Sequence, residues 1–506
     1  MINALEWIRV RLFGSARAIA VIVSLAFVVF FLVVAIWHLQ YPYEIEWYEG
    51  LMMDHIMRVV NGLPIYAAPD LYFSAALYQP LYYYVVAPLI HWTGPAFLAG
   101  RIVTVASTVL TAMVILFTVS RLTHRSKFAM CVAAGLFFST YNLTELVQTV
   151  VRVDSLYVLF IITAFYAISQ RRMLTSILAG VLLAAAYFTK QEAIFFYPLP
   201  FLWLFLIHRH QAVISVAVLV GLIAVGTLLL QSSSHGWYSY YVYGMPRAKG
   251  QYYGYMRVIA AFPTEILRYW GVAALILGMF IGLVRGKAFS LKSPEGFWAL
   301  AVLSAVLQLC AHRGDQMSGN NVLHPLSAML AVFIPYAVWR TSQERHSLAR
   351  VFEWGLVIQL VVFIVDPRWQ PMLLPGASER TRADHFVAYL HSLPGDVVIP
   401  AHGFLGPMAG KQTHTHCQVE DDVLVMRDSI SRHYQDGWRD ALVNRKFAAY
   451  IWDDGGSPRP DSIPGYTYAG MLPDSLRIGC KMGPRIIRPT FLYLPVGSAM
   501  PKYRSE

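Results

Sequence analysis

Residues 18–37 read AIAVIVSLAFVVFFLVVAIW, and residues 41–50, just beyond them, read YPYEIEWYEG. The first stretch carries no charge and is as long as an α-helix needs to be to cross the hydrocarbon core of a bilayer, about 20 residues. The second stretch carries Glu44, Glu46 and Glu49. Carboxylates crowded at the mouth of a membrane helix are costly to desolvate, so their presence indicates a functional site.

The composition of the whole chain agrees with a membrane protein. Of its 506 residues, 57% are hydrophobic and 14% are charged, and the mean hydropathy is +0.49. Soluble domains carry about 25% charged residues, so we expect a polytopic protein in contact with the lipid bilayer. The net charge of +11 is explained by basic residues on short loops between spans, and no nucleic-acid partner is expected.

Apolar runs of near-spanning length recur as far as residue 365. The sequence therefore predicts a mainly α-helical protein with about eleven transmembrane helices. The predicted spans are 17–39, 98–119, 127–141, 153–169, 173–188, 191–207, 211–230, 269–285, 296–311, 322–339 and 349–365.

The stretch from Leu77 to Trp92 is interpreted as a juxtamembrane helix that does not cross. It contains Pro80, Pro88 and a run of three tyrosines, which favour the membrane interface. With this assignment, basic residues gather on alternate connections and mark the cytoplasmic face. The first outer loop, 40–97, and everything after the last span then face the outside.

The chain is predicted to divide into a membrane domain, 1–368, and a small extracytoplasmic α/β domain, 369–506. Strands are expected at Gly395–Pro400 and Ala448–Trp452, and helices near 382–393 and 430–446. Cys417 and Cys480 both fall in this polar region, where the sequence leaves open whether they form a disulfide.

The three glutamates of the first loop are candidates for acid–base chemistry. In an extended segment, Glu44 and Glu46 point to the same side, and Glu49 joins them only if the chain turns. Neighbouring carboxylates raise one another's pKa, so one of them can accept a proton near neutral pH. The same oxygens could hold a divalent cation, Mg²⁺ or Mn²⁺, at Glu44 and Glu46. The alternative is a set of solvated acids on an interfacial loop.

Three further polar clusters lie at the predicted outer ends of helices. Arg152 and Asp154 open one span, residues 189–192 (TKQE) form a corner between two spans, and residues 312–324 form a dense polar turn. Lysine, arginine and histidine in such places are suited to binding a phosphate. A snorkelling arginine with a helix cap, an interfacial anchor and a hydrated loop are the respective alternatives.

Short blocks in these regions resemble GT-C glycosyltransferases, in particular bacterial relatives of the protein mannosyltransferases and of the aminoarabinose lipid A transferase. The likeness covers roughly residues 20–365, and the order of the blocks carries it. In chain order they are residues 46–50, 61–66 (NGLPIY), 78–84 (YQPLYYY), Gly94, Arg101, 152–154 (RVD), 189–191 (TKQ) and 319–321 (GNN).

The resemblance implies an inverting transfer, on the periplasmic or outer face of a bacterial inner membrane, from a polyprenyl-phosphate sugar to a glycan, lipid or protein acceptor. Carried over by position, Glu46 looks like the base, with Glu44 or Glu49 as its partner. The family often has adjacent acidic residues here, so the spaced glutamates leave the identity of the base open. The donor phosphate is expected to bind Lys190, Arg152, Arg313 and His324. The remaining predicted substrate-binding residues are Asp154, Gln191, Tyr78, Asn320 and Asn321.

Two other functional classes share parts of this pattern. A transporter or flippase for a lipid-linked or anionic envelope precursor also has membrane helices and intramembrane charges, but it predicts charges at mid-membrane and matching broken helices. A scaffold without catalysis would tolerate loss of the glutamates. The gathering of ionisable residues at one face favours the transferase.

Overall fold

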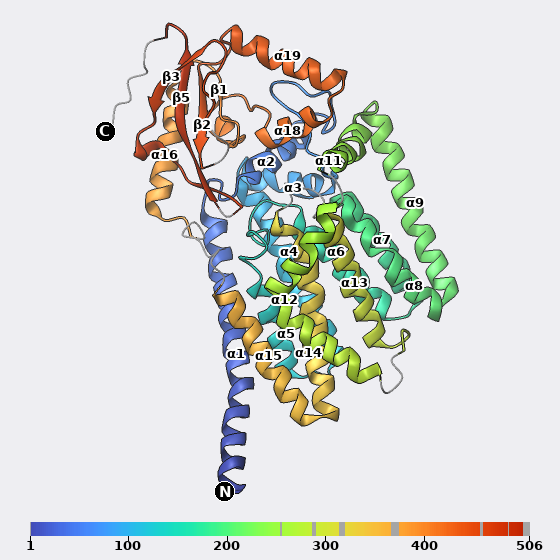
Figure 1. Ribbon diagram of the computed structural model, residues 1–506. Helices are drawn as coiled ribbons and strands as arrows, with labels where there is room; N and C mark the ends of the chain where they lie inside the picture. Colours follow the sequence, from blue (N-terminus) through green and yellow to red (C-terminus); the bar gives the residue numbers. More distant parts are fainter. Residues whose placement is uncertain are drawn as a thin grey trace.

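The computed structural model describes residues 2–253, 256–285, 290–312, 319–365, 374–455, 459–483 and 485–498. A bundle of helices forms one end of the molecule and a sheet flanked by helices forms the other (Figure 1). Two short helices, α2 (Tyr48–Val60) and α3 (Leu81–Thr93), lie between them.

The helices of the bundle follow the predicted spans closely. Six helices in the described chain are long and apolar enough to cross a membrane, and five shorter apolar helices coincide with the remaining predictions. The bundle helices are α1 (Ile2–Gln40), α4 (Phe97–Leu122), α5 (Lys127–Ser139), α6 (Asp154–Ser169), α7 (Met173–Thr189), α8 (Pro198–Ile207), α9 (Arg209–Ser233), α12 (Met256–Arg285), α13 (Pro294–His312), α14 (His324–Glu344) and α15 (His346–Ile364). The 3₁₀ turns η1 (Gln191–Phe196) and η3 (Asn320–Leu323) precede α8 and α14.

Helices α14 and α9 show where the bundle has its centre and its edge. The apolar window of the η3–α14 segment is 94% buried inside the protein, whereas that of α9 is 11% buried. The exposed side chains of α9 are large and apolar, for example Val213, Val220 and Leu228. A helix that is apolar all round and exposed is suited to lipid, so α9 lies at the lipid-facing edge and α14 at the core.

The predicted juxtamembrane helix is present as α3. It begins directly after Pro80 and contains Pro88, and its 13 residues rise only about 20 Å, too short for a 30 Å hydrocarbon core. Helix α2, of the same length, packs against α3. The chain from Trp237 to Tyr253 adds short turns, α10 (Trp237–Ser239), η2 (Tyr240–Gly244) and α11 (Met245–Tyr253).

The C-terminal region forms a mixed α/β unit. Its sheet has the order β1-β2-β5-β3, with β1 parallel to β2, the other pairs antiparallel, and β4 also paired with β5. The two strands and two helices predicted from sequence are present, and β3, β4, β5 and α18 were not predicted. The elements are α16 (Ala377–Ser392), β1 (Val397–Val398), α17 (Leu405–Met408), α18 (Cys417–Val425), α19 (Ser429–Val443), β2 (Ala449–Asp454), β3 (Tyr466–Met471), η5 (Asp474–Leu476), β4 (Cys480–Met482) and β5 (Arg485–Pro495). Cys417 and Cys480 are both free thiols.

The first loop joins the C-terminal unit through a short parallel bridge between Glu46 and Lys481. The amide of Lys481 donates to the Ile45 carbonyl at 2.8 Å, and the Trp47 amide donates to the Lys481 carbonyl at 3.1 Å. Backbone hydrogen bonds of this kind fix strand register. The acidic segment is therefore held between the helical bundle and β4.

Candidate active site

A cavity of about 340 Å³ opens where the bundle, α2 and α18 meet. Its wall is made from segments far apart in the sequence, so it exists only in the folded protein. Ionisable and polar side chains lining it include Glu46, Tyr78, Arg152, Lys190, Glu192 and Asn321. The sequence-predicted clusters of the first loop, of residues 152–154, of residues 189–192 and of residue 321 thus converge on one cavity.

Glu46 is the first-loop glutamate that lines this cavity. Its carboxylate is 6% exposed and accepts a hydrogen bond from the Tyr48 amide at 3.2 Å. Its nearest cation is the Arg152 guanidinium, 3.6 Å from Oε2. Burial raises the pKa of the Glu46 carboxyl to about 8, and Arg152 opposes the rise. A carboxyl group with this pKa can take up a proton near neutral pH, as a general base must.

Arg152 and Lys190 supply positive charge beside Glu46. Lys190 Nζ lies 3.0 Å from Asp154 Oδ1 and 3.2 Å from Glu192 Oε1. Arg152 Nε lies 3.6 Å from Asp154 Oδ2, and its guanidinium stacks 4.2 Å above the Tyr48 ring. Among the described residues Arg152 Nη1 has no hydrogen-bond partner. Nη1 is the nitrogen that pairs with Glu46 Oε2 at 3.6 Å, so an anion bound there would share it with that carboxylate.

Asp154 holds the two cations in place. Besides Lys190, its Oδ1 accepts a hydrogen bond from Asn321 Nδ2 at 3.0 Å. Its helix, α6, starts at Asp154 itself, so the carboxylate sits at the positive end of the helix dipole. Asp154 is thus a positioning residue, and Asn321 ties the turn before α14 to it.

Two further acidic residues lie on the cavity wall: Glu192, which belongs to the predicted 189–192 cluster but was given no role, and Glu145, which was not predicted. Glu192 binds His312 as well as Lys190, and Glu145 Oε1 accepts the Asn320 amide at 3.0 Å. Added at Gly319, a Cβ would lie 2.5 Å from Glu145 Oε2, so a larger residue there would displace the Glu145 carboxylate. Glu145 lies in a turn with positive φ, and no periodic pattern in the sequence marks such a position.

Glu49 is used for structure instead of facing the cavity. Its two oxygens accept Arg101 Nε at 2.8 Å, Arg101 Nη2 at 2.7 Å, the Val151 amide at 2.8 Å and the Ile45 amide at 2.7 Å. Arg101 also donates to the carbonyls of His38 and Tyr43. This fully buried pair fastens the first loop to α4.

Glu44 turns away from Glu46. It is fully buried, does not line the cavity, and binds His402 of the C-terminal unit. The expectation that Glu44 and Glu46 share one side is not met, because the chain bends at Tyr43 and Ile45, Glu44 binds His402 and Glu46 lines the cavity. Binding of Mg²⁺ or Mn²⁺ by Glu44 and Glu46 stays a prediction.

The other predicted residues lie around the cavity at different depths. Tyr78 lines it, with Lys190 Nζ 6.0 Å from its ring. Gln191 donates to the Leu77 carbonyl at 3.0 Å behind the wall, and Asn320 contributes its backbone amide to Glu145. His324 is buried against Phe137 and does not line the cavity, because it begins α14 in the bundle core. Arg313 lies outside the described residues.

Lys249 and Asp422 close the cavity on the side of the C-terminal unit. The two residues lie 2.8 Å apart and join α11 to α18. Gln418, also on α18, lines the same wall and donates to Asp422 at 3.2 Å. These three residues were not predicted, because a single lysine in a loop and polar residues on a short helix carry no distinctive sequence signal.

Part of the chain matches a described family of proteins. Residues 76–312 match the family described as Glycosyltransferase family 87, which is slightly less than half of the chain. This segment includes Tyr78, Arg152, Asp154 and Lys190, and it ends before Asn321. None of the curated proteins matches the chain in sequence.

Solved structures share the fold of nearly the whole chain. ArnT from Cupriavidus metallidurans bound to undecaprenyl phosphate matches with a TM-score of 0.57 and 12% identity, covering 94% of this chain and 99% of that one. ArnT in the apo state gives 0.56 and 11%, covering 92% and 97%. The oligosaccharyltransferase of Archaeoglobus fulgidus in complex with Zn and sulfate gives 0.52 and 11%, covering 87% and 68%.

The predicted resemblance to GT-C membrane glycosyltransferases is thereby confirmed. The protein is a mainly helical membrane protein with the GT-C fold. The family match and the fold together support a glycosyltransferase of the GT-C type.

Proposed function

We propose that the protein transfers a sugar from a polyprenyl-phosphate donor to a glycan, lipid or protein acceptor of the cell envelope, with inversion at the anomeric carbon. The arrangement that carries this proposal is one cavity in which a carboxylate of raised pKa, Glu46, faces two cations, Arg152 and Lys190. ArnT, which shares the fold, has been solved with undecaprenyl phosphate.

In the proposed reaction, Glu46 takes the proton from the acceptor hydroxyl as its oxygen attacks the anomeric carbon. The new glycosidic bond forms on the face opposite the breaking C–O bond, which gives inversion. The electron pair of that bond leaves with the lipid phosphate, whose growing negative charge is stabilised by Arg152 and Lys190. The products are the glycosylated acceptor and the polyprenyl phosphate.

The binding of the donor changes the partners of Arg152. In the structure its guanidinium lies between Glu46 and Asp154, at 3.6 Å from each. A phosphate bound to Arg152 Nη1 would compete with Glu46 for this cation, which raises the pKa of the Glu46 carboxyl and makes it a stronger base. No step of the proposed reaction is assigned to a divalent cation at Glu44 and Glu46, because Glu44 binds His402 outside the cavity.

A transporter fits the geometry less well. The ionisable side chains of the cavity lie at the ends of helices, next to α2 of the first loop and α18 of the C-terminal unit, and not halfway along the spans.

We propose that this end of the molecule faces the periplasm of a bacterial inner membrane. Reporter fusions after positions 92, 124 and 370 test this orientation, and a cytoplasmic location of position 370 would contradict it.

The central experiment replaces the proposed base. Glu46→Gln keeps the size of the side chain and removes its basicity, so we expect a loss of sugar transfer of about 10²–10⁴-fold. Transfer is measured in vesicles that contain a polyprenyl-phosphate sugar and envelope acceptors. Glu344→Gln, on the exposed end of α14, is the matched control and should keep wild-type activity. Wild-type activity of Glu46→Gln would eliminate Glu46 as the base.

A further inference from the structure

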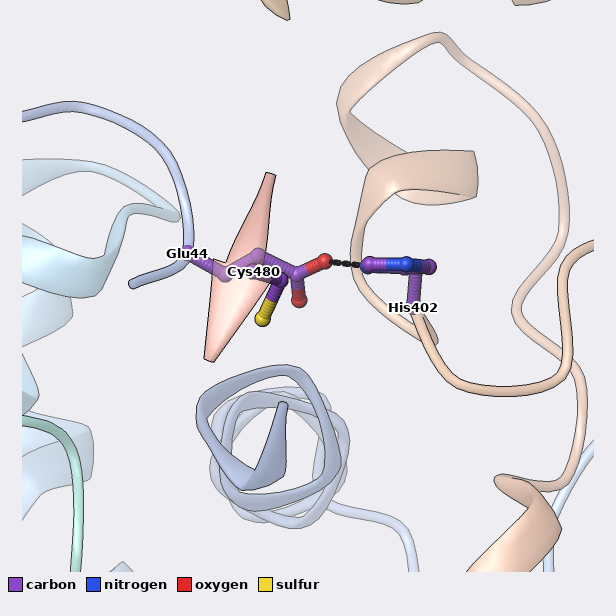
Figure 2. Close-up of side chains that lie close together, drawn as sticks. All are labelled: Glu44, His402 and Cys480. Atoms are coloured by element: carbon purple, nitrogen blue, oxygen red, sulfur yellow. Dashed lines mark hydrogen bonds and ion pairs between the residues drawn. The ribbon is translucent and has the colours of Figure 1, made fainter. Parts of the chain in front are cut away.

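A second group of reactive side chains lies outside the catalytic cavity. Glu44 of the first loop, His402 of the segment after β1, and Cys480 at the start of β4 converge at one point (Figure 2). One donor atom from each lies within 4.8 Å of the other two. All three side chains are buried, with exposed fractions of 0%, 1% and 0%, and none lines the cavity around Glu46.

This group contains donor atoms that the protein leaves poorly satisfied. Glu44 Oε1 binds His402, but Glu44 Oε2 has no hydrogen-bond partner in the described chain. The Cys480 thiol has only a weak contact at 4.0 Å with the Lys481 carbonyl. A buried carboxylate oxygen without a partner is costly, and the cost is removed if a ligand occupies the space beside it.

Asp453 orients the histidine toward this space. Its Oδ1 lies 2.8 Å from His402 Nε2, which fixes the ring with Nδ1 directed at Glu44. A carboxylate that accepts the far N–H of an imidazole is the usual outer partner of a metal-bound histidine. The Glu46–Lys481 bridge brings Glu44 and Cys480 together from the two ends of the chain.

We propose that Glu44, His402 Nδ1 and Cys480 Sγ bind a Zn²⁺ ion that fastens the first loop to the C-terminal unit. Thiolate, imidazole and carboxylate are the three protein donors that zinc accepts, whereas Mg²⁺ and Ca²⁺ take oxygen donors and disfavour sulfur. The second oxygen of Glu44 or a water completes the coordination.

Charge balance is satisfied by this assignment. Zn²⁺ displaces the Cys480 Sγ proton and the His402 Nδ1 proton, so two positive charges replace two protons. The net charge of the buried group is unchanged. Without zinc, a protonated His402 would donate hydrogen bonds to both Glu44 and Asp453. Glu44 Oε2 and the Cys480 thiol would then still lack a strong partner among the described residues.

The first test measures zinc bound to the purified full-length protein, incubated with ZnCl₂ and dialysed. We expect about one zinc per chain in the wild type and at least a tenfold weaker zinc affinity for Cys480→Ser. Cys417→Ser is the matched control, because Cys417 is another thiol of the C-terminal unit but not part of the group. Equal zinc content in wild type and Cys480→Ser would overturn the proposal.

The second test does not depend on the folding of a variant. Cobalt replaces zinc in such sites and shows a thiolate-to-cobalt charge-transfer band, which we expect for wild type and Cys417→Ser. Absence of this band in the folded wild-type protein would overturn the assignment of Cys480. Neither test uses a sugar donor, so their outcome is independent of the proposed transferase activity.

Discussion

Glu46 and Glu49 are three residues apart in the chain, both are buried, and each faces an arginine, yet their surroundings differ. Glu49 accepts five hydrogen bonds, two of them from Arg101 at 2.8 and 2.7 Å. Glu46 accepts one from a neighbouring amide and meets Arg152 at 3.6 Å beside a cavity. A buried carboxylate whose oxygens are all hydrogen-bonded stabilises the fold. A carboxylate with few hydrogen bonds that lines a cavity can instead react with a bound substrate.

Among the variants compared, loss of the Arg101–Glu49 ion pair should lower the free energy of unfolding most. Arg101→Met leaves Glu49 buried without its cation, which we expect to cost about 3–5 kcal/mol of the free energy of unfolding. Thermal unfolding in detergent measures the loss. Glu46→Gln is the contrasting variant, with an expected change below about 1 kcal/mol, and equal destabilisation by both would remove the distinction.

On the cavity side, Lys190→Ala tests electrostatic stabilisation of the leaving phosphate. Loss of such a donor costs about 10²–10³-fold in turnover in comparable sites, and we expect a fall of this size in kcat/KM. Lys190→Arg keeps the charge and should recover part of the activity. Activity equal to wild type in Lys190→Ala would show that the phosphate binds elsewhere.

The pH dependence sharpens the comparison further. Because burial raises the pKa of Glu46 to about 8 and the base must be ionised, kcat/KM should rise about tenfold per pH unit below pH 8 and level off above it. Arg152 lowers this pKa, so Arg152→Gln should move the midpoint to higher pH. A midpoint that moves to lower pH would contradict the proposed pairing.

The smallest effect is expected for an ion pair in solvent. Arg340 and Glu344 lie 2.9 Å apart on α14, but their side chains are 44% and 34% exposed. Glu344→Gln should change the free energy of unfolding by no more than about 0.5 kcal/mol and leave transfer unchanged. A loss near that of Arg101→Met would mean that burial is not what separates the two pairs.

The sequence predicted the parts of the fold that follow from local pattern. Apolar runs such as residues 18–37 and 211–230 marked spans, and Pro80 with the tyrosines marked α3, because length and periodicity act locally. Strands β4 and β5 pair with each other at short range, but β5 is fixed mainly by β2 and β3, and such pairing between separate segments leaves no local sequence pattern. The same reason hid the partners of Glu44, which come from the far end of the chain.

Within the candidate site, the predicted residues Glu46, Arg152 and Lys190 line one cavity, and Asp154 binds the two cations beside it. His324 did not reach the cavity, since its place at the start of α14 puts it in the bundle core. Glu145 could not be foreseen, because its position depends on a tight turn and on Gly319. The roles of the converging residues remain predictions that the experiments above address.

The bridge between Glu46 and Lys481 joins the first loop to β4, which is synthesised near the end of translation. Spans emerge from the ribosome first, but the segment that carries the proposed base gains its backbone partner only when β4 has been synthesised and delivered to the same side. Incomplete chains therefore insert in the membrane without an aligned carboxylate. If Glu46 is the base proposed above, a nascent chain that lacks β4 has no aligned base for sugar transfer.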